Sequence, residues 1–297
     1  MYILTHEDII RFEEEFRKAQ EQGVSEELRG WNWRSPPLKP AFSVRLPNYL
    51  VSSNYCATGR DGHVSKVLNV KPKETEPISA GVSLHRLVYE VFESIMEAGR
   101  PAPFEELSKR ISGNAEFLKA AYDYTALSAM ASVSEMRAKF PFAPLKDLIR
   151  ISLPFVLELK VDGSFIGLTK NLSIDAFDYM RRIVFDLKYL RPESKPEPWR
   201  RLYVTGYAIT LEALYSIPFD VGCLVYVQYN GSLSVTRDIF FISDDLRREW
   251  IEERDRKLEI VASRVDPGLP RACYDPCPYS HYCSRGKLGS GLRRFRA

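Results

Sequence analysis

The chain has 297 residues, of which 45% are hydrophobic and 27% are charged. This composition is typical of a globular protein with one large domain or two small ones, and no apolar run is long enough to span a membrane. The 42 basic and 39 acidic residues leave a net charge of only +3, so overall charge is excluded as an indication of a polyanionic partner.

The first residues, MYILTHEDIIRFEEEFRK, turn acidic at once and do not match the pattern of a signal peptide. We therefore expect a cytoplasmic protein with no membrane partner and with reduced thiols. Apolar periodicity predicts a helix at residues 5–21. The Pro- and Trp-rich residues 30–47 predict an ordered extended stretch, and a loop, SSNYCATGRDG, then holds Cys56.

A second helix is predicted at residues 83–99, because SLHRLVYEVFESIMEAG carries one apolar stripe. Ser83 is its expected N-cap, and Gly99 follows its last turn. Residues 103–140 also have a helical pattern, which two prolines close.

Four short strands are then predicted in succession, in the segments SLPFVLELKV, SFIGLT, LSIDAF and RIVFDLKYL. After the proline-rich break RPESKPEPW, the pattern indicates a helix at residues 201–217 and a hairpin that turns at Asn230-Gly231. A long charged helix, opened by an Asp cap, follows at residues 244–264. This order predicts a mixed α/β fold without regular βαβ alternation.

Three of the five cysteines lie close together near the end of the chain, at Cys273, Cys277 and Cys283. In a reducing compartment such a group indicates metal binding or catalysis rather than disulfides. Four thiolates complete either a tetrahedral zinc site or a cubane iron–sulfur cluster. The alternative is that the thiols are scattered and have no shared role.

The fourth ligand must come from a distant part of the chain, and only two cysteines remain. Cys223 lies in an apolar strand pattern, typical of a small core residue. Cys56 lies in a loop beside two glycines, where a side chain can turn toward a metal. We therefore favour Cys56, with His281 as a possible substitute ligand.

A second group of polar residues lies in two of the predicted strands. Asp175 is placed at the end of one strand, and the next strand carries Asp186, Leu187 and Lys188. Since strand side chains alternate, Asp186 and Lys188 share a face while Leu187 points into the core. A hairpin would bring Asp175 beside Asp186, and two carboxylates form a site for Mg²⁺ or Mn²⁺, as used in metal-assisted hydrolysis of a phosphodiester.

Each of these signals has an ordinary structural alternative. The Asp-x-Lys spacing is common on exposed strands, and Glu158 and Lys160 repeat it as a decoy. His85, at the edge of its helix stripe, is typical of a packed, hydrogen-bonded histidine. Tyr203 and Tyr207 share one helix face and either pack or support a substrate phosphate.

The order of these residues resembles a known family of nucleases. A helix-borne His85 precedes Asp175, then Asp186-x-Lys188 and Tyr207, with one cysteine before them and three after them. The order and the segment CPYSHYC resemble the RecB-like branch of the PD-(D/E)XK nucleases, in which an iron–sulfur cluster joins the two ends of the domain. Within it the chain is most similar to the CRISPR-associated exonucleases of the Cas four family, and LRGWNW, PPLKP and YCATGRD resemble the archaeal Csa-one variant.

The resemblance implies a PD-(D/E)XK restriction-endonuclease-like core with a helical N-terminal part and a C-terminal iron–sulfur module. Residues 1–80 would be an N-terminal segment that carries the first cluster cysteine. Residues 81–265 would be the RecB-like core, with a helical insertion at about 101–145. Residues 266–297 would hold the cysteine cluster and a basic tail that could touch phosphates.

The resemblance also implies the role of each residue. The metal ion would be held by His85, Asp175, Asp186 and the backbone carbonyl of Leu187. Lys188 would act with the two aspartates in catalysis, and Tyr203 and Tyr207 would lie on the substrate side. A [4Fe-4S] cluster would be held by Cys56, Cys273, Cys277 and Cys283. The activity would be a metal-dependent exonuclease that trims spacer precursors at single-stranded or overhanging DNA ends, together with the CRISPR adaptation integrase proteins.

Three residues depart from the pattern of that family. Asp186 stands where Glu is usual, Tyr203 stands where Gln is usual, and the first two cluster cysteines are separated by three residues rather than two. These departures leave a second hypothesis open, a DNA-end-binding adaptor with a weakened or inactive nuclease site. A zinc-stabilised structural protein is the third.

Overall fold

A computed structural model describes residues 1–271, 273 and 277–285, without the side chains of 284 and 285. The basic tail predicted at the end of the chain lies almost entirely outside the described residues. Among the residues described, no helix combines the length and the apolar character needed to cross a membrane.

The centre of the molecule is one five-stranded sheet in the order β1-β2-β3-β4-β5. Its strands are β1 (Phe155–Val161), β2 (Leu172–Asp178), β3 (Ile183–Tyr189), β4 (Val221–Tyr229) and β5 (Leu233–Phe241). All neighbours pair antiparallel except β3 and β4, which run parallel. The parallel pair needs a crossover, which helix α8 provides. The mixed α/β class and the hairpin at Asn230-Gly231 are therefore confirmed.

The helices surround this sheet. The α-helices are α1 (His6–Gln22), α2 (Asn48–Ser52), α3 (Arg60–Lys66), α4 (Glu76–Ala98), α5 (Phe104–Leu107), α6 (Ala115–Lys139), α7 (Leu145–Ser152), α8 (Arg201–Tyr215), α9 (Asp244–Ser263) and α10 (Ser280–Arg285). The 3-10 helices are η1 (Glu26–Leu28), η2 (Gly30–Asn32), η3 (Ser164–Ile166) and η4 (Pro198–Arg200).

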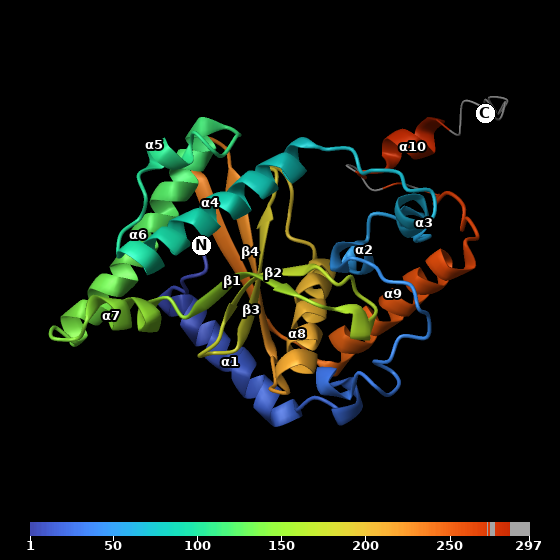
Figure 1. Cartoon of the computed structure of the whole chain (residues 1–297), viewed down its shortest axis with the longest axis horizontal. Helices are drawn as coiled ribbons and strands as arrows, with labels where there is room; N and C mark the ends of the chain where they lie inside the picture. The colour runs from blue at the N-terminus through green and yellow to red at the C-terminus, as the bar shows by residue number, and fades with distance from the viewer. Residues whose placement is uncertain (272, 274–276, 286–297) are drawn as a thin grey trace.

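Two hydrophobic cores lie on opposite faces of the sheet. One is built by α4 and α6 with side chains such as Phe92 and Phe185. The other is built by α8, α9 and the N-terminal segment, with Trp250 and Leu224. Figure 1 shows α4 and α6 on one side of the strands and α8 and α9 on the other, with α2, α3 and α10 grouped at one end. The sheet is thus covered on both faces.

Several predicted boundaries were wrong for local reasons. The segment SFIGLT is not a strand, because the Asp162 carboxylate accepts a 2.8 Å hydrogen bond from the Ser164 amide and starts the turn of η3. Helix α4 begins at Glu76 with Thr75 as its N-cap, seven residues before the predicted cap Ser83. The N-cap of α9 is Ser243, while the Asp244 carboxylate is bonded instead to Ser25.

Residues 30–47 are not the extended stretch predicted from their prolines. They contain η2 and a series of turns. Gly30 lies so close to α8 that a Cβ there would come within 2.1 Å of the Ile209 carbonyl oxygen. The buried Arg254 of α9 donates to the carbonyls of Leu38 and Pro37, at 2.6 and 2.9 Å. Tertiary contacts, rather than local preference, fix the path of this segment.

Buried cations of α9 hold the N-terminal segment in place. Arg247, Arg254 and Lys257 are all fully buried. The ammonium of Lys257 donates to the carbonyls of Leu50, Val51 and Ser53, at 2.7, 3.1 and 2.6 Å. Since these carbonyls end α2, Lys257 positions the loop that carries Cys56.

Candidate active site and cysteine group

The hairpin of β2 and β3 brings two aspartates together, as the sequence predicts. The register pairs Ala176 with Phe185, and continuing it sets Asp175 opposite Asp186. Asp175 lies within β2, however, and not at its end as predicted. Its Oδ2 accepts a 2.9 Å hydrogen bond from the Leu187 amide, which ties the two strands at this point.

Glu158 lies at the point in β1 where the strand stops packing against one hydrophobic core and starts packing against the other. Phe155 and Leu157 belong to the α4 side, whereas Leu159 and Val161, which would share their face in a regular strand, belong to the α8 side. Glu158 has a φ of +47°, a conformation that non-glycine residues rarely adopt. Such strain is retained where the surrounding structure demands it, often at functional sites.

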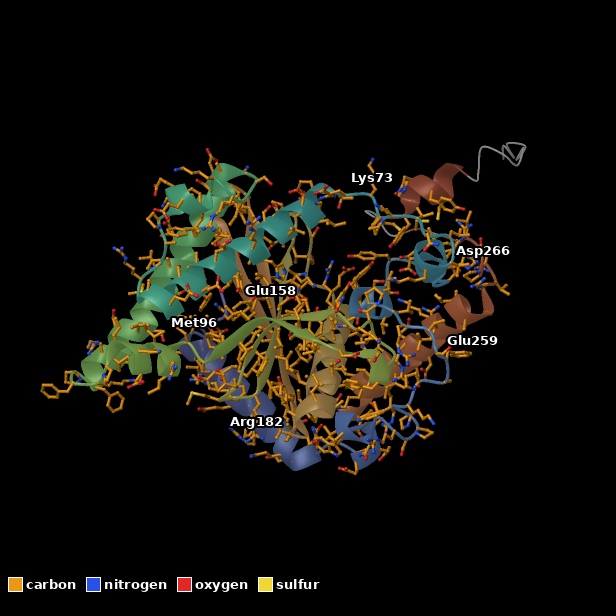
Figure 2. The ribbon with its side chains drawn as sticks, viewed as in Figure 1. Lys73, Met96, Glu158, Arg182, Glu259 and Asp266 are labelled. Atoms are coloured by element: carbon orange, nitrogen blue, oxygen red, sulfur yellow. The ribbon has the colours of Figure 1, made fainter. Side chains whose placement is uncertain are left out.

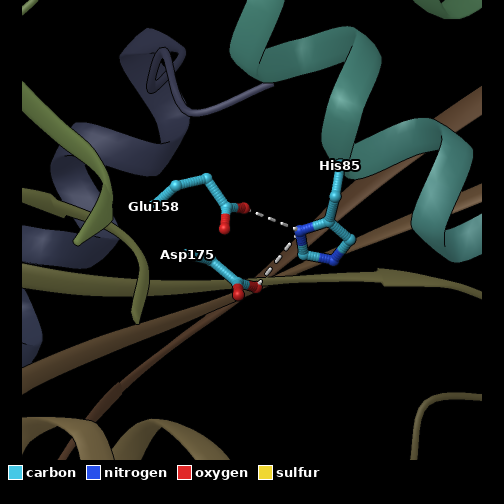
Figure 3. Close-up of side chains that lie close together, drawn as sticks. All are labelled: His85, Glu158 and Asp175. Atoms are coloured by element: carbon cyan, nitrogen blue, oxygen red, sulfur yellow. Dashed lines mark ion pairs between the residues drawn. The ribbon is translucent and has the colours of Figure 1, made fainter. Parts of the chain in front are cut away.

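His85, Glu158 and Asp175 converge between α4 and the sheet. His85 Nδ1 lies 3.7 Å from Glu158 Oε1 and 3.7 Å from Asp175 Oδ2 (Figure 3). On its other side, Nε2 lies 2.8 Å from the Leu187 carbonyl oxygen. These three side chains place one potential metal ligand each within 4.8 Å of one another. Figure 2 shows Glu158 near the middle of the molecule.

The charges of this group shift the pKa of its members. Burial opposes the charged form of His85, but Asp175 and Glu158 outweigh it and raise the pKa of His85 to about 9. Burial raises the pKa of Asp186 to about 6, against the effect of Lys188 and with a contribution from Asp175. For Glu158, burial is outweighed by the bonds from His85 and Ser173, so its pKa is lowered. The strong mutual influence shows that these groups form one electrostatic unit.

Leu187 is buried in the α4-side core, and Lys188 lies on the α8 side of β3 with Asp186. Asp186 is fully buried, and Lys188 Nζ lies 2.9 Å from both of its oxygens. Only Oδ1 accepts a hydrogen bond, and Oδ2 has no hydrogen-bond partner among the residues described. A buried carboxylate oxygen without a hydrogen-bond partner is uncommon and has capacity for a further ligand.

The two predicted tyrosines lie against the same group. Lys188 Nζ sits 4.2 Å from the centre of the Tyr203 ring, a cation–π contact. Burial raises the pKa of Tyr207 well above its usual value, with further contributions from Asp175 and Asp186. Sequence reasoning missed Tyr2, which is buried on the other core and whose pKa is raised by burial and by Asp175.

Glu158 is the principal site residue that the sequence prediction passed over. The β1–β2 register places it opposite Asp175, since Leu157 pairs with Ala176 and Leu159 with Ile174. Pairing β1 with β2 would have set Glu158 opposite Asp175, but the backbone conformation that changes the face of β1 at Glu158 has no sequence signal. Lys160, by contrast, has a 68% exposed side chain and is bonded to Ser173. Of the Glu158 and Lys160 pair, which was predicted to be a decoy, Glu158 therefore lies in the centre of the site and Lys160 does not.

The four cysteines that the sequence groups together do lie together. The thiols of Cys277 and Cys283 have a pKa raised first by burial, and the charges of neighbouring thiols act on both. Those neighbours include Cys56 for both residues and Cys273 for Cys283. Cys223 is fully buried on β4, within the α4-side core.

Two segments that are far apart in the sequence, residues 60–73 and 266–283, meet at this cysteine group. Arg60 Nη1 lies 3.3 Å from Cys283 Sγ, and the same guanidinium forms a bidentate pair with Asp266 at 2.7 Å. The Lys73 amide donates to the Pro278 carbonyl at 2.8 Å. Figure 1 shows α3 and α10 close together although they are distant in sequence.

The spread of the thiols bears on which group they could hold. In the described part of the chain only His85, Glu158 and Asp175 place three such ligand atoms within 4.8 Å. Four ligands around one zinc ion, with Zn–S bonds of about 2.3 Å, would lie roughly 3.8 Å apart. The thiols are thus spaced more widely than a single zinc ion requires. His281 lies in α10, and its buried Nδ1 accepts no hydrogen bond from any described residue.

Comparison with known proteins gives a consistent result. The family model described as "CRISPR-associated exonuclease Csa1" matches residues 3–286. A CRISPR-associated exonuclease Csa1 of Saccharolobus solfataricus is 29% identical over 296 residues, covering 94% of this chain and 98% of its own length. That of Thermoproteus tenax is 28% identical over 266 residues, covering 88% and 91%. The crystal structure of SSO0001 aligns with 75% of this chain and 93% of its own at 16% identity, but its TM-score of 0.30 is too low to support an argument.

Proposed function

The chain belongs to the family of CRISPR-associated exonuclease Csa1, and we propose that it is a metal-dependent deoxyribonuclease with a PD-(D/E)XK core. Its substrate is a DNA end, single-stranded or overhanging, and its task is to trim spacer precursors with the CRISPR adaptation integrase proteins. The observation that carries this proposal is the convergence of His85, Asp175, Asp186 and Lys188 on one hairpin and one helix.

The donor set suits a divalent cation. Carboxylate oxygens, a carbonyl oxygen and one imidazole nitrogen favour Mg²⁺ or Mn²⁺. Asp186 Oδ2, which is ion-paired with Lys188 but accepts no hydrogen bond from the described residues, and the grouped ligand atoms of His85, Glu158 and Asp175 support a bound ion. The ligands would be His85, Asp175, Asp186 and the Leu187 carbonyl, with Glu158 in reach of the same position. When bound, the ion supplies charge that polarises a phosphate and lowers the pKa of a water molecule.

The chain's own residues supply the remaining requirements of hydrolysis. Lys188 places a positive charge beside Asp186, where it can stabilise the negative charge that develops on the phosphate. The ring of Tyr203 lies under the ammonium and limits its movement. The Leu187 amide fixes the Asp175 carboxylate, so the acid is held in place before substrate arrives.

A matched pair of lysines tests this proposal. Lys188→Ala should abolish metal-dependent cleavage of end-labelled single-stranded DNA and leave the melting temperature within a few degrees. Lys160→Ala removes a lysine at the same spacing from an acid, on an exposed edge strand, and should cleave at the wild-type rate. Full activity in Lys188→Ala would contradict the assignment.

We also propose that Cys56, Cys273, Cys277 and Cys283 hold a [4Fe-4S] cluster. Support comes from the mutual influence of the thiols, their wide spacing and the guanidinium of Arg60 beside Cys283. The cluster would tie residue 56 to residue 283 and lower the entropy of the unfolded chain. Anaerobic absorbance with iron and zinc analysis tests it, using Cys56→Ala and, as a control, Cys223→Ala. Colourless protein with stoichiometric zinc would refute it.

A second candidate function is a DNA-end-binding adaptor with an inactive site. The observation that favours it is the close pairing of Lys188 with Asp186, a residue one methylene shorter than the usual glutamate. This hypothesis predicts salt-dependent DNA binding without metal-dependent products. The cleavage assay above distinguishes the two.

A further inference from the structure

A row of aromatic rings leads outward from the candidate catalytic lysine. Beyond Tyr203, whose ring lies under Lys188, comes Trp199 with its centroid 6.1 Å away, and then Tyr55 at 5.9 Å from Trp199 in an edge-to-face arrangement. Tyr203 is buried, whereas Trp199 and Tyr55 are only half-buried. The Tyr55 side chain also has a hydrogen bond with the Tyr203 side chain, so the row is a cluster of three rings that reaches from the interior of the site to the surface.

The two outer rings come from segments that are far apart in sequence. Trp199 belongs to η4, just before α8, and Tyr55 follows α2. Figure 1 shows α2 beside α8, and the two helices pack together. The contact between Trp199 and Tyr55 is therefore not a consequence of local sequence. It depends on the packing of the N-terminal segment against α8.

The segments that carry these rings are held rigidly. Gln228 Nε2 donates to the carbonyls of Arg191 and Ser194, at 2.8 and 2.9 Å, which fixes the proline-rich segment before Trp199. Lys257 holds the end of α2, two residues before Tyr55, through the Ser53 carbonyl. Rings fixed in advance lose little conformational entropy when a ligand stacks on them.

Positive charge and a free hydroxyl lie along the same row. The Arg200 guanidinium lies 4.8 Å from the centre of the Trp199 ring, with Glu197 as its ion-pair partner. On β4, Tyr226 is the register partner of Lys188, is 2% exposed and has a hydroxyl with no hydrogen-bond partner among the described residues. Rings next to cations and an unused donor suit a nucleotide, whose base stacks while its phosphate accepts hydrogen bonds.

We propose that Trp199 and Tyr55 form a stacking subsite for one base of a single-stranded DNA end, next to Lys188. The strand would enter over the half-buried rings, and its phosphate would face Lys188, Arg200 and the Tyr226 hydroxyl. A duplex is excluded from this contact because its bases are already stacked on each other, so the subsite selects single-stranded ends. This inference rests on the proposed action on DNA ends.

The experiment measures binding of a short oligothymidine in Ca²⁺, so that cleavage does not interfere. A series of probes carries one abasic position each, and wild type should bind one of them distinctly more weakly than the intact probe. Trp199→Ala should bind the intact probe roughly five- to hundred-fold more weakly. It should also lose the abasic penalty, which is the loss of affinity caused by removing that one base. Trp199→Phe should retain most of the affinity for the intact probe and most of the abasic penalty.

The control is Trp31→Ala, which removes a half-buried tryptophan that also has a guanidinium, that of Arg29, over its ring. It should bind both probes as wild type does. Tyr55→Ala provides a second test of the same contact if Trp199→Ala lowers the melting temperature. An unchanged abasic penalty in both variants, or wild type that binds no single strand, would overturn the subsite. Failure of the nuclease proposal would instead appear as wild-type protein that binds single-stranded DNA but gives no metal-dependent cleavage products.

Discussion

Replacing Lys257 with methionine should destabilise the protein strongly. The substitution keeps an unbranched stem of similar length but removes an ammonium that is fully buried and donates to three carbonyls. The carbonyls of Val51 and Ser53 would then lose their Lys257 donor in a dry environment, and that of Leu50 would keep only the 3.4 Å bond from the Ser53 hydroxyl. They could recover partners only if the end of α2 moved.

The expected magnitude follows from the number of bonds lost. Each buried carbonyl left unsatisfied costs about 1–3 kcal/mol, so the two that lose their donor cost roughly 2–6 kcal/mol, and the weakened Leu50 carbonyl adds to this. Part of this free-energy loss is offset, because the variant no longer has to bury a charged group. Burial already disfavours the charged form of Lys257 and lowers its pKa. We expect a net loss of about 3–5 kcal/mol, as measured when one partner of a buried charged contact is removed. Most domains have a total stability of only about 5–15 kcal/mol.

Urea unfolding followed by circular dichroism measures this loss. Lys66→Met is the matched control, since Lys66 is exposed at the end of α3 and the same change there should alter stability by at most about 0.5 kcal/mol. If Lys257→Met unfolds at the same urea concentration as Lys66→Met, the buried ammonium does not support α2. The account of how the Cys56 loop is positioned would then be wrong.

Three further predictions follow from the charged groups. Glu158→Gln should weaken Mn²⁺ binding at least several-fold by calorimetry, whereas the same change at the exposed Glu259 of α9 should not. Equal affinities would remove Glu158 from the site. The raised pKa of His85, about 9 against 6.5, means that the charged form stabilises the metal-free fold. This contribution to the free energy of unfolding, at most about 3 kcal/mol, is complete below pH 6.5 and lost as pH rises through 9. The free energy of unfolding should therefore fall less between these two pH values in His85→Gln than in wild type. An equal fall in both proteins would contradict this prediction. The pKa of Asp266, lowered to about 2 by Arg60, should return toward 3.8 in Arg60→Met when measured by NMR, and a value still near 2 would exclude Arg60 as the cause.

Period-two patterns and turns predicted most of the sheet. The hairpin of β2 and β3 was predicted from its two apolar runs, and this was sufficient to bring Asp175 beside Asp186. Glu158 was missed because the face of β1 changes at that residue, through a backbone conformation that no sequence pattern indicates. A regular alternation assigns one face to the whole strand, and here the strand serves two cores.

The ends of the helices and the burial of α9 depend on partners far away in the sequence. By sequence α9 is a charged helix, yet Arg247, Arg254 and Lys257 are fully buried. Their partners include backbone carbonyls of the N-terminal segment, about two hundred residues earlier. Carbonyl acceptors carry no sequence signature, so neither these contacts nor the path of residues 30–47 could be predicted from residue types.

The loop after α2 links the cysteine group to the candidate active site. Tyr55 contacts Trp199, and the charge of the next residue, Cys56, acts on the thiols of Cys277 and Cys283. Because adjacent residues share one backbone, whatever fixes Cys56 also fixes Tyr55, and through it the outer end of the aromatic row. The proposed cluster, which would join Cys56 to Cys283, would therefore have a consequence at the substrate side. Loss of Cys56 as a ligand should reduce affinity for single-stranded DNA even in protein that remains folded. Cys223→Ala, in the core, should lower this affinity only as far as it lowers the stability of the fold.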